Sequence, residues 1–279
     1  MLVIASYFGV ILCGAVVIGQ QLTEPLTGKV CCLALAHEDI HFQTADGVTL
    51  AGWYIPPKNG AVILLLHSYY STRMQTVPIA NMLARHGYGI LMYDQRASGE
   101  SGGDVRSLGW RDIPDVSRAV SFVQSRTGTE QTHIGIYGCS VGGAMALAAA
   151  ARNSSITAVV ADAPSSMSFS ENFPTFNDPT WGIDMPMYTF YFSFVALRAQ
   201  ALPPTSTRQA VQAIAPRPLL LISTGQPGES QRVDGFYNAA GPGKIQWNIP
   251  EAGHCGGPSI RPANYEKHLV DFFDFSFKK

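Results

Sequence analysis

A serine between two glycines carries the clearest chemical signal in the sequence. Residues 138–142 read Gly-Cys-Ser-Val-Gly, which matches the pattern G-x-S-x-G, with an apolar run before them and an Ala-rich stretch after them. A sharp turn from strand to helix lifts a serine oxygen clear of a sheet, and small flanking residues allow the turn to close. The amino end of the following helix also favours the negative charge that develops on a substrate oxygen. We therefore predict that Ser140 is a nucleophile.

A histidine stands where a general base would be needed. His254 ends the segment Pro-Glu-Ala-Gly-His at residues 250–254, between an apolar run at 244–249 and a helical pattern at 262–275. A serine hydroxyl is a weak nucleophile at its free pKa, so an imidazole within hydrogen-bond reach is required. We predict that His254 accepts the proton of Ser140.

The third member of such a triad is a carboxylate between the nucleophile and the base in chain order. Glu229 is our first choice, because it lies in the loop after the apolar run 219–223, and α/β sites assemble in loops at the carboxyl ends of strands. Asp234, about a turn further on, and Asp162, at the end of the preceding strand, are the alternative acids.

Two backbone N–H groups are needed to stabilise the oxyanion of the intermediate. The residue after the nucleophile, Val141, supplies one, and the loop after the apolar run 61–66 supplies the other, which we assign to Tyr69. His67 in the same loop is interpreted as a structural residue that orients the loop.

The elements that must position these residues alternate along the chain. Short apolar runs alternate with helix-length amphipathic segments, a pattern that is typical of a parallel sheet with helices on both faces. The expected fold class is α/β, with a mostly parallel central sheet of about eight strands. The strands are predicted at 38–44, 48–55, 61–66, 89–93, 132–137, 156–161, 219–223 and 244–249.

The alternation is interrupted between residues 164 and 204. This stretch is rich in proline, serine and aromatic residues and has few charges. We expect it to form a short aromatic cap over the serine, where an apolar lining would suit a lipophilic group and exclude water.

The first residues form an apolar run without a charged side chain from 2 to 19. As a helix this run would be about 27 Å long, which nearly spans a bilayer. We expect residues 1–19 to be a membrane anchor, with a secretory signal that is cleaved as the alternative, residues 20–37 to be a linker, and 38–279 to be the catalytic domain.

Composition excludes other classes of function. There are 19 Lys and Arg residues against 20 Asp and Glu residues, and no basic run, so nothing supplies the positive surface that nucleic-acid binding requires. Residues 37–41 read His-Glu-Asp-Ile-His, which fits the zinc pattern H-E-x-x-H in letters, but that motif needs a helix and here a strand is predicted. No metal and no cofactor are expected.

The cysteines do not resemble a disulfide framework. Their number is five, and two of them are adjacent, whereas frameworks use spaced, even sets. Cys139 and Cys255, which flank the two predicted catalytic residues, are interpreted as small buried apolar residues.

Four segments together resemble a known superfamily. They are residues 67–69 (His-Ser-Tyr), 94–101 (Asp-Gln-Arg-Ala-Ser-Gly-Glu-Ser), the serine pentapeptide and 252–254 (Ala-Gly-His). Over residues 38–277 the chain resembles the α/β-hydrolase superfamily, and within it the single-domain branch of esterases, acylglycerol lipases and serine aminopeptidase-like proteins. That family usually has His-Gly where this chain has His67-Ser68, Gly-His where it has Ala97-Ser98, and an aspartate after the seventh strand where it offers Glu229.

The resemblance implies a serine hydrolase. Together with the residues above it predicts cleavage of carboxylic esters (EC 3.1.1 rather than 3.4), with a small lipophilic ester as the substrate and an acyl-enzyme on Ser140. A peptidase or a thioesterase could use the same triad, because the fold does not decide the substrate. A catalytically silent, membrane-tethered binding protein is the non-enzyme alternative. The oligomeric state stays open.

Overall fold

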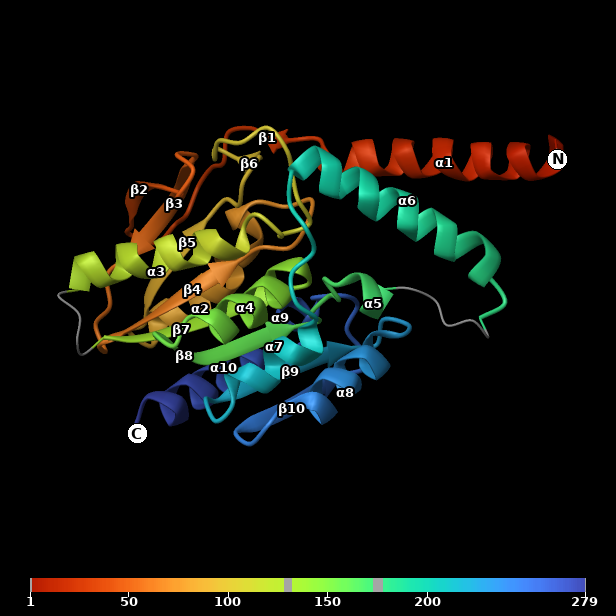
Figure 1. Ribbon diagram of the computed structural model, residues 1–279. Helices are drawn as coiled ribbons and strands as arrows, with labels where there is room; N and C mark the ends of the chain where they lie inside the picture. The colour runs from red at the N-terminus through yellow and green to blue at the C-terminus, as the bar shows by residue number, and fades with distance from the viewer. Residues whose placement is uncertain (1, 128–131, 173–177, 279) are drawn as a thin grey trace.

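A single mixed sheet forms the centre of the protein (Figure 1). In the computed structural model, which describes residues 2–127, 132–172 and 178–278, eight strands join in the order β10-β9-β8-β7-β4-β5-β3-β2. Neighbouring strands are parallel except where β3 pairs with β2 and β5. The strands are β2 (Glu38–Gln43), β3 (Thr49–Ile55), β4 (Ala61–Leu66), β5 (Gly89–Tyr93), β7 (His133–Cys139), β8 (Ile156–Asp162), β9 (Leu219–Thr224) and β10 (Lys244–Ile249).

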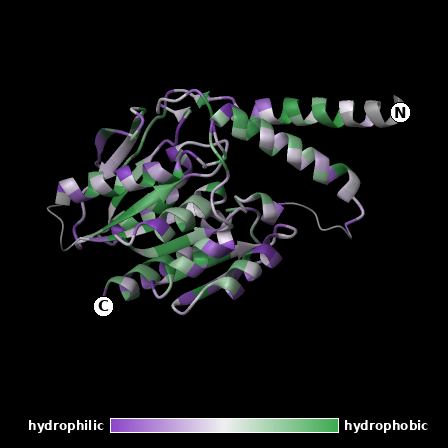
Figure 2. Cartoon of the chain, in the orientation of Figure 1, coloured by the Kyte–Doolittle hydropathy of each residue, from purple (hydrophilic) through white to green (hydrophobic). Residues whose placement is uncertain are grey.

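This sheet confirms the predicted fold class. The middle strands are hydrophobic along their length (Figure 2), because helices cover both faces and strands buried on both sides need no polar face. In β4, for example, Leu64 packs in the cluster on one face and Leu65 in the cluster on the other. One face is covered by α3 (Ile113–Thr127), α4 (Val141–Arg152), α7 (Thr207–Ile214) and α8 (Glu229–Ala239), and the other by α2 (Val77–Arg85) and α10 (Pro262–Phe277).

The turn between β7 and α4 has the geometry that the pentapeptide predicts. Ser140 has a φ of 56° and a ψ of −119°, a left-handed conformation that non-glycine residues rarely adopt. Gly142 packs against the end of β4, where an added Cβ would come within 2.5 Å of the carbonyl oxygens of Leu66 and His67. The serine turn and the loop after β4 are therefore in direct backbone contact.

The apolar N-terminal run forms a helix that pairs with another helix. Helix α1 (Leu2–Thr23) lies beside α6 (Trp181–Ala199), and the pair extends away from the sheet (Figure 1). Gly14 of α1 faces Met187, Gly19 faces Phe194, and the hydroxyl of Tyr7 donates to the carbonyl of Gly182.

The predicted membrane anchor is wrong. Among the described residues no helix has the length and the apolarity that crossing a bilayer requires. The physical reason is visible in the pairing with α6, because Ile11 and Ala15 of α1 are buried within the protein itself. Another helix therefore covers part of the apolar surface of α1.

The segment expected as a linker is attached to the body of the protein. Helix α1 continues to Thr23, and strand β1 (Leu26–Thr27) pairs with β6 (Ser98–Gly99). The guanidinium of Arg106 donates to the carbonyls of Gln21 and Glu24. These bonds satisfy carbonyl groups at the end of α1 that have no partner within the helix.

The close contact at Gly142 leads to a stability prediction. Gly142→Ala should lower the free energy of unfolding by about 1–3 kcal/mol, because the new methyl group must displace backbone. Gly182→Ala is the matched control. Its Cβ would meet no atom within 4 Å, and in a helix alanine is favoured over glycine by about 1 kcal/mol. Urea unfolding of both variants measures the difference, and equal stability of the two would contradict the packing.

Candidate active site

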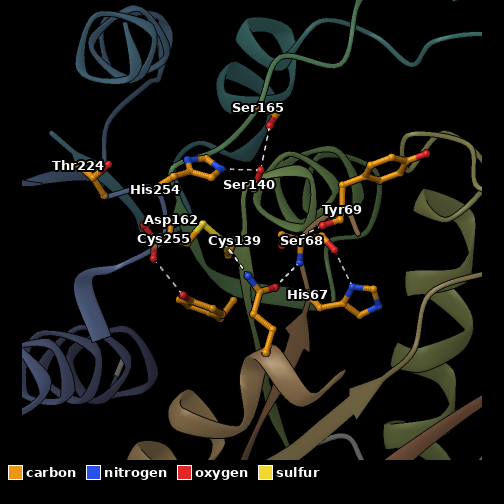
Figure 3. The surroundings of a disulfide bond; sticks show 12 residues. His67, Ser68, Tyr69, Cys139, Ser140, Asp162, Ser165, Thr224, His254 and Cys255 are labelled. Atoms are coloured by element: carbon orange, nitrogen blue, oxygen red, sulfur yellow. Dashed lines mark hydrogen bonds between the residues drawn. A yellow bond between two sulfur atoms is a disulfide. The ribbon is translucent and has the colours of Figure 1, made fainter. Parts of the chain in front are cut away.

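Ser140, His254 and Glu229 are brought together at the carboxyl edge of the sheet. Ser140 follows β7, Glu229 begins α8 after β9, and His254 follows β10. The Nε2 atom of His254 lies 2.9 Å from Oγ of Ser140, and its Nδ1 atom lies 2.6 Å from Oε2 of Glu229. Figure 3 shows the imidazole of His254 facing the hydroxyl of Ser140. The three side chains form one hydrogen-bonded chain, and their roles in catalysis remain predictions.

The carboxylate of Glu229 is fully buried, yet its charge is favoured. Its Oε1 atom accepts from the backbone N–H and the hydroxyl of Thr224, each at 2.7 Å. Burial alone would raise the pKa of Glu229, but the hydrogen bonds from His254 and Thr224 outweigh burial and hold that pKa below its usual range. A charged Glu229 accepts the Nδ1–H of His254, which leaves Nε2 free to accept the proton of Ser140.

The two alternative acids lie elsewhere. Asp234 is exposed on α8, and its carboxylate accepts from the side chain of Gln246 at 2.6 Å. Asp162 ends β8 and is fully buried, with Oδ2 accepting from the hydroxyls of Tyr137 and Tyr265 at 3.1 and 2.8 Å. Neither carboxylate is hydrogen-bonded to His254.

Asp162 differs electrostatically from Glu229. Burial raises its pKa to about 6, and the nearby charge of Glu229 adds to this effect. Two neutral hydroxyls stabilise a carboxylate less than an imidazole, a hydroxyl and an amide do together. Asp162 therefore lies next to the triad as a carboxyl group that readily holds its proton.

The predicted oxyanion donors lie in the two segments that touch at Gly142. Val141 starts α4 and Tyr69 lies in the loop after β4. Within the described ranges the backbone N–H groups of Val141 and Tyr69 have no hydrogen-bond acceptor, as donors to a substrate oxygen require. Their role as the oxyanion hole remains a prediction.

His67 holds the loop that carries Tyr69. Its Nδ1 atom lies 2.8 Å from the carbonyl oxygen of Ser68, and its Nε2 atom accepts from the amide of Gln95 at 3.0 Å. Burial lowers the pKa of His67, so the ring is neutral and can donate from one nitrogen while accepting at the other. This arrangement fits the structural role expected for His67.

The fold is shared with proteins of known structure. The esterase Pf2001 of Pyrococcus furiosus matches with a TM-score of 0.73 at 23% identity, over 92% of this chain and 98% of its own. The α/β hydrolase GrgF of Penicillium sp. matches with a TM-score of 0.66 at 19% identity, over 88% of this chain and 100% of its own. The chain therefore has the fold of these α/β hydrolases.

Sequence comparison finds similarity to proteins of different descriptions. The family model of X-Pro dipeptidyl-peptidases (S15 family) matches residues 46–175, a range that includes Ser140 but neither Glu229 nor His254. The thiohydrolase aneE of Aspergillus aculeatus is 28% identical over 132 residues, which are 46% of this chain and 42% of that protein. The uncharacterised protein YfhR of Escherichia coli is 24% identical over 84% of this chain and 80% of its own length. The chain thus spans less than half the length of aneE, and the similarities do not fix the reaction or the bond that is cleaved.

The interpretation of Cys139 and Cys255 as unpaired residues is wrong. The two cysteines form a disulfide across 116 residues of sequence, with their Cα atoms 6.1 Å apart (Figure 3). The odd number of cysteines hid the pair, because Cys13, Cys31 and Cys32 are free and exposed. The position of one cysteine before the serine and the other after the histidine was the signal that could have shown it.

Sequence reasoning also missed three polar residues around the triad. Thr224 holds Glu229, as described above. The hydroxyl of Ser165 lies 3.3 Å from that of Ser140 (Figure 3). Gln75 accepts from the amide of Ser68 at 2.6 Å. None of them belongs to a motif, since each reaches the site only through the path of its loop.

No metal centre is found in the part of the chain that the structure describes, where no group of three His, Cys, Asp or Glu side chains could hold an ion. His41 of the pattern H-E-x-x-H lies within strand β2. The helix that a zinc motif of this type requires is therefore not formed there.

The raised pKa of Asp162 predicts how stability depends on pH. The pKa is about 6 in the folded protein against an ordinary value of 3.8, so the folded state binds the proton more tightly. The free energy of unfolding should fall as the pH rises from about 4 to 6, by about 3 kcal/mol for this group.

Asp162→Asn should remove that decrease, because the amide does not titrate and its oxygen can still accept from the two tyrosines. Urea unfolding at pH 4 and pH 7 measures the change for the wild type and the variant. Asp234→Asn, an exposed control, should keep the pH dependence of the wild type. An Asp162→Asn protein that keeps it as well would refute the assignment.

Proposed function

We propose that this protein is a serine esterase that cleaves carboxylic esters through an acyl-enzyme on Ser140. The observation that carries the proposal is the continuous hydrogen-bonded chain from Ser140 through His254 to the buried Glu229. A nucleophile, a base and an acid in this order are what acyl transfer by a serine requires. The strained backbone of Ser140 adds support, because such a conformation serves to present the hydroxyl.

The reaction follows from these contacts. Nε2 of His254 takes the proton as Oγ of Ser140 attacks the ester carbonyl, and Glu229 stabilises the imidazolium that forms. The amides of Val141 and Tyr69 stabilise the negative oxygen of the tetrahedral intermediate. His254 then gives its proton to the leaving alcohol, and water, activated by the same imidazole, releases the acid.

An apolar acyl or alkyl group suits the surroundings of the serine. Ser165, in contact with Ser140, leads into α5 (Phe169–Asn172), where the ring of Phe169 packs 4.9 Å from that of Phe192 and 6.5 Å from that of Trp110. Much of this aromatic cluster packs α6 onto the domain through Phe192. Its position next to Ser165 favours a lipophilic substrate over a charged one.

A thioesterase or a peptidase would use the same three residues. The similarity to aneE favours a thioester as the second substrate class, since thioesters and esters give the same acyl-enzyme. A dipeptidyl-peptidase needs a carboxylate for the substrate amine. Glu171, the acidic residue that follows Ser165, is engaged instead with the amides of Thr207 and Arg208, each at 2.9 Å. For this reason we favour the ester.

Active-site labelling tests the nucleophile. A fluorophosphonate should add to the wild type once, and Ser140→Ala should abolish both this addition and hydrolysis of p-nitrophenyl butyrate. Ser165→Ala, a loss of the neighbouring hydroxyl, should still be labelled. Intact-mass spectrometry reads the result. Labelling that persists in Ser140→Ala, or a folded wild type that is never labelled, would overturn the proposal.

Substitution of the acid tests the assignment of Glu229. Glu229→Gln keeps the shape but removes the charge that stabilises the imidazolium and selects the tautomer of His254, so kcat should fall by about 10³–10⁴-fold. Asp234→Asn should leave kcat within about twofold, because this exposed carboxylate does not contact His254. Steady-state kinetics with the same ester distinguish them, and a larger loss in Asp234→Asn would reverse the assignment.

A further inference from the structure

The disulfide joins the two residues that flank the nucleophile and the base. Cys139 immediately precedes Ser140, and Cys255 immediately follows His254. The link therefore connects the end of β7 with the loop after β10. The same two segments are joined by the hydrogen bond between Ser140 and His254, which the proposed reaction needs. A covalent bond one residue away on each side restricts how far these two side chains can separate.

The loop of His254 has its other attachment before the histidine. The carbonyl of Ala252 accepts from the amide of Gly225 at 2.9 Å, which ties the loop to the end of β9. The side chain of His254 is 40% exposed, so surrounding atoms hold it only in part. The disulfide provides the attachment on the other side, one residue after His254.

Gln75 extends this link to the oxyanion loop. Its Nε2 atom donates to Sγ of Cys139 at 3.7 Å, and its Oε1 atom accepts from the amide of Ser68 at 2.6 Å. Ser68 precedes Tyr69, the predicted oxyanion donor. The loops of the nucleophile, the base and the oxyanion donor thus meet at one sulfur pair.

The disulfide is also open to reagents from one side. Cys139 is buried, but Cys255 is half-buried. Both cysteines line a cavity of about 150 Å³ together with Gln75 and Pro258. A small thiol that enters this cavity meets Cys255 first, which makes the bond accessible to exchange.

We propose that the disulfide Cys139–Cys255 positions His254 for catalysis, and that a dithiol reductant reversibly lowers the turnover of the enzyme by breaking it. The inference rests on the proposed function, because it assigns a positioning role in the same site. In the reduced protein, the loop of His254 keeps its attachment at Ala252 but loses the one at Cys255. A displacement of a catalytic group by about 1 Å costs on the order of 10²-fold in rate.

The dithiol supplies the electrons and the protons that reduction of the disulfide requires. One thiolate of the reductant attacks Sγ of Cys255, the bond between the two cysteines breaks, and Cys139 leaves with the electron pair and takes up a proton. The second thiol of the reductant then attacks the mixed disulfide and releases Cys255 as a thiol. The reductant becomes a disulfide, and the protein gains two electrons and two protons.

The test uses the full chain with Cys13, Cys31 and Cys32 replaced by serine, so that Cys139 and Cys255 are the cysteines that remain. The oxidised protein is compared with the protein reduced by dithiothreitol, with alkylation and intact mass to follow the bond. Reduction should lower kcat for p-nitrophenyl butyrate by about 10–100-fold with KM within about twofold. Hydrogen exchange of residues 251–257 should rise, and reoxidation should restore both.

A second variant keeps the proposal falsifiable. Cys139→Ala/Cys255→Ala in the same background should have the low kcat of the reduced protein and should not respond to dithiothreitol. Complete reduction with unchanged kcat and unchanged exchange would overturn the inference, as would free thiols in the protein before reduction. Loss of the far-UV circular dichroism on reduction would also overturn the inference, because it would show that the disulfide stabilises the whole fold.

Failure of the proposed function gives a different result. An oxidised protein that neither hydrolyses the ester nor reacts with a fluorophosphonate would refute esterase activity. A rise in hydrogen exchange at residues 251–257 on reduction would in that case still show that the disulfide positions the histidine loop. The two ideas can therefore fail separately.

Discussion

The order of the parallel strands determines which side chains meet at the site. Strands β4, β7, β8, β9 and β10 are neighbours and run in one direction, so the segments after them emerge at one edge of the sheet. The loop of Tyr69, the turn of Ser140, Asp162, Glu229 and His254 lie at or just after the ends of these five strands in turn. The sheet consequently fixes the position of the site, and the helices mainly bury the two faces of the sheet.

Burial at this edge has opposite effects on two carboxyl groups. Glu229 receives two hydrogen bonds from Thr224 and one from His254, and its pKa stays below the ordinary range. Asp162 receives two phenolic hydroxyls, and its pKa rises to about 6. The two groups differ in the number and the kind of their donors, and the group with the lower pKa is the one that is bonded to the histidine.

The sequence predicted the sheet closely and the site in part. Runs such as residues 61–66 are apolar without alternation because both faces are buried, and this pattern needs no knowledge of distant residues. The choice among Glu229, Asp234 and Asp162 depends on the path of a loop. Gly228, with a φ of 75°, turns the chain so that Glu229 points back at Thr224, and no local pattern reveals such a direction.

Contacts between distant segments explain what sequence reasoning missed. The disulfide joins residues 116 positions apart, so the pair can be found only by expecting Ser140 and His254, their neighbours in sequence, to meet in the fold. The apolar run of α1 gives the same pattern whether lipid or another helix covers it. Its partner, α6, begins at Trp181, and the pairing became apparent only in the folded chain.

The attachment of α1 connects the projecting helix pair to the loop that carries Tyr69. The hydroxyl of Tyr69 donates to the carbonyl of Leu22, and the guanidinium of Arg106, bonded to Gln21 and Glu24, lies 4.8 Å from the centre of the Tyr69 ring. The end of α1 therefore contacts Tyr69, whose amide is the predicted oxyanion donor. A shift of the helix pair relative to the sheet would therefore act directly on the loop that carries Tyr69.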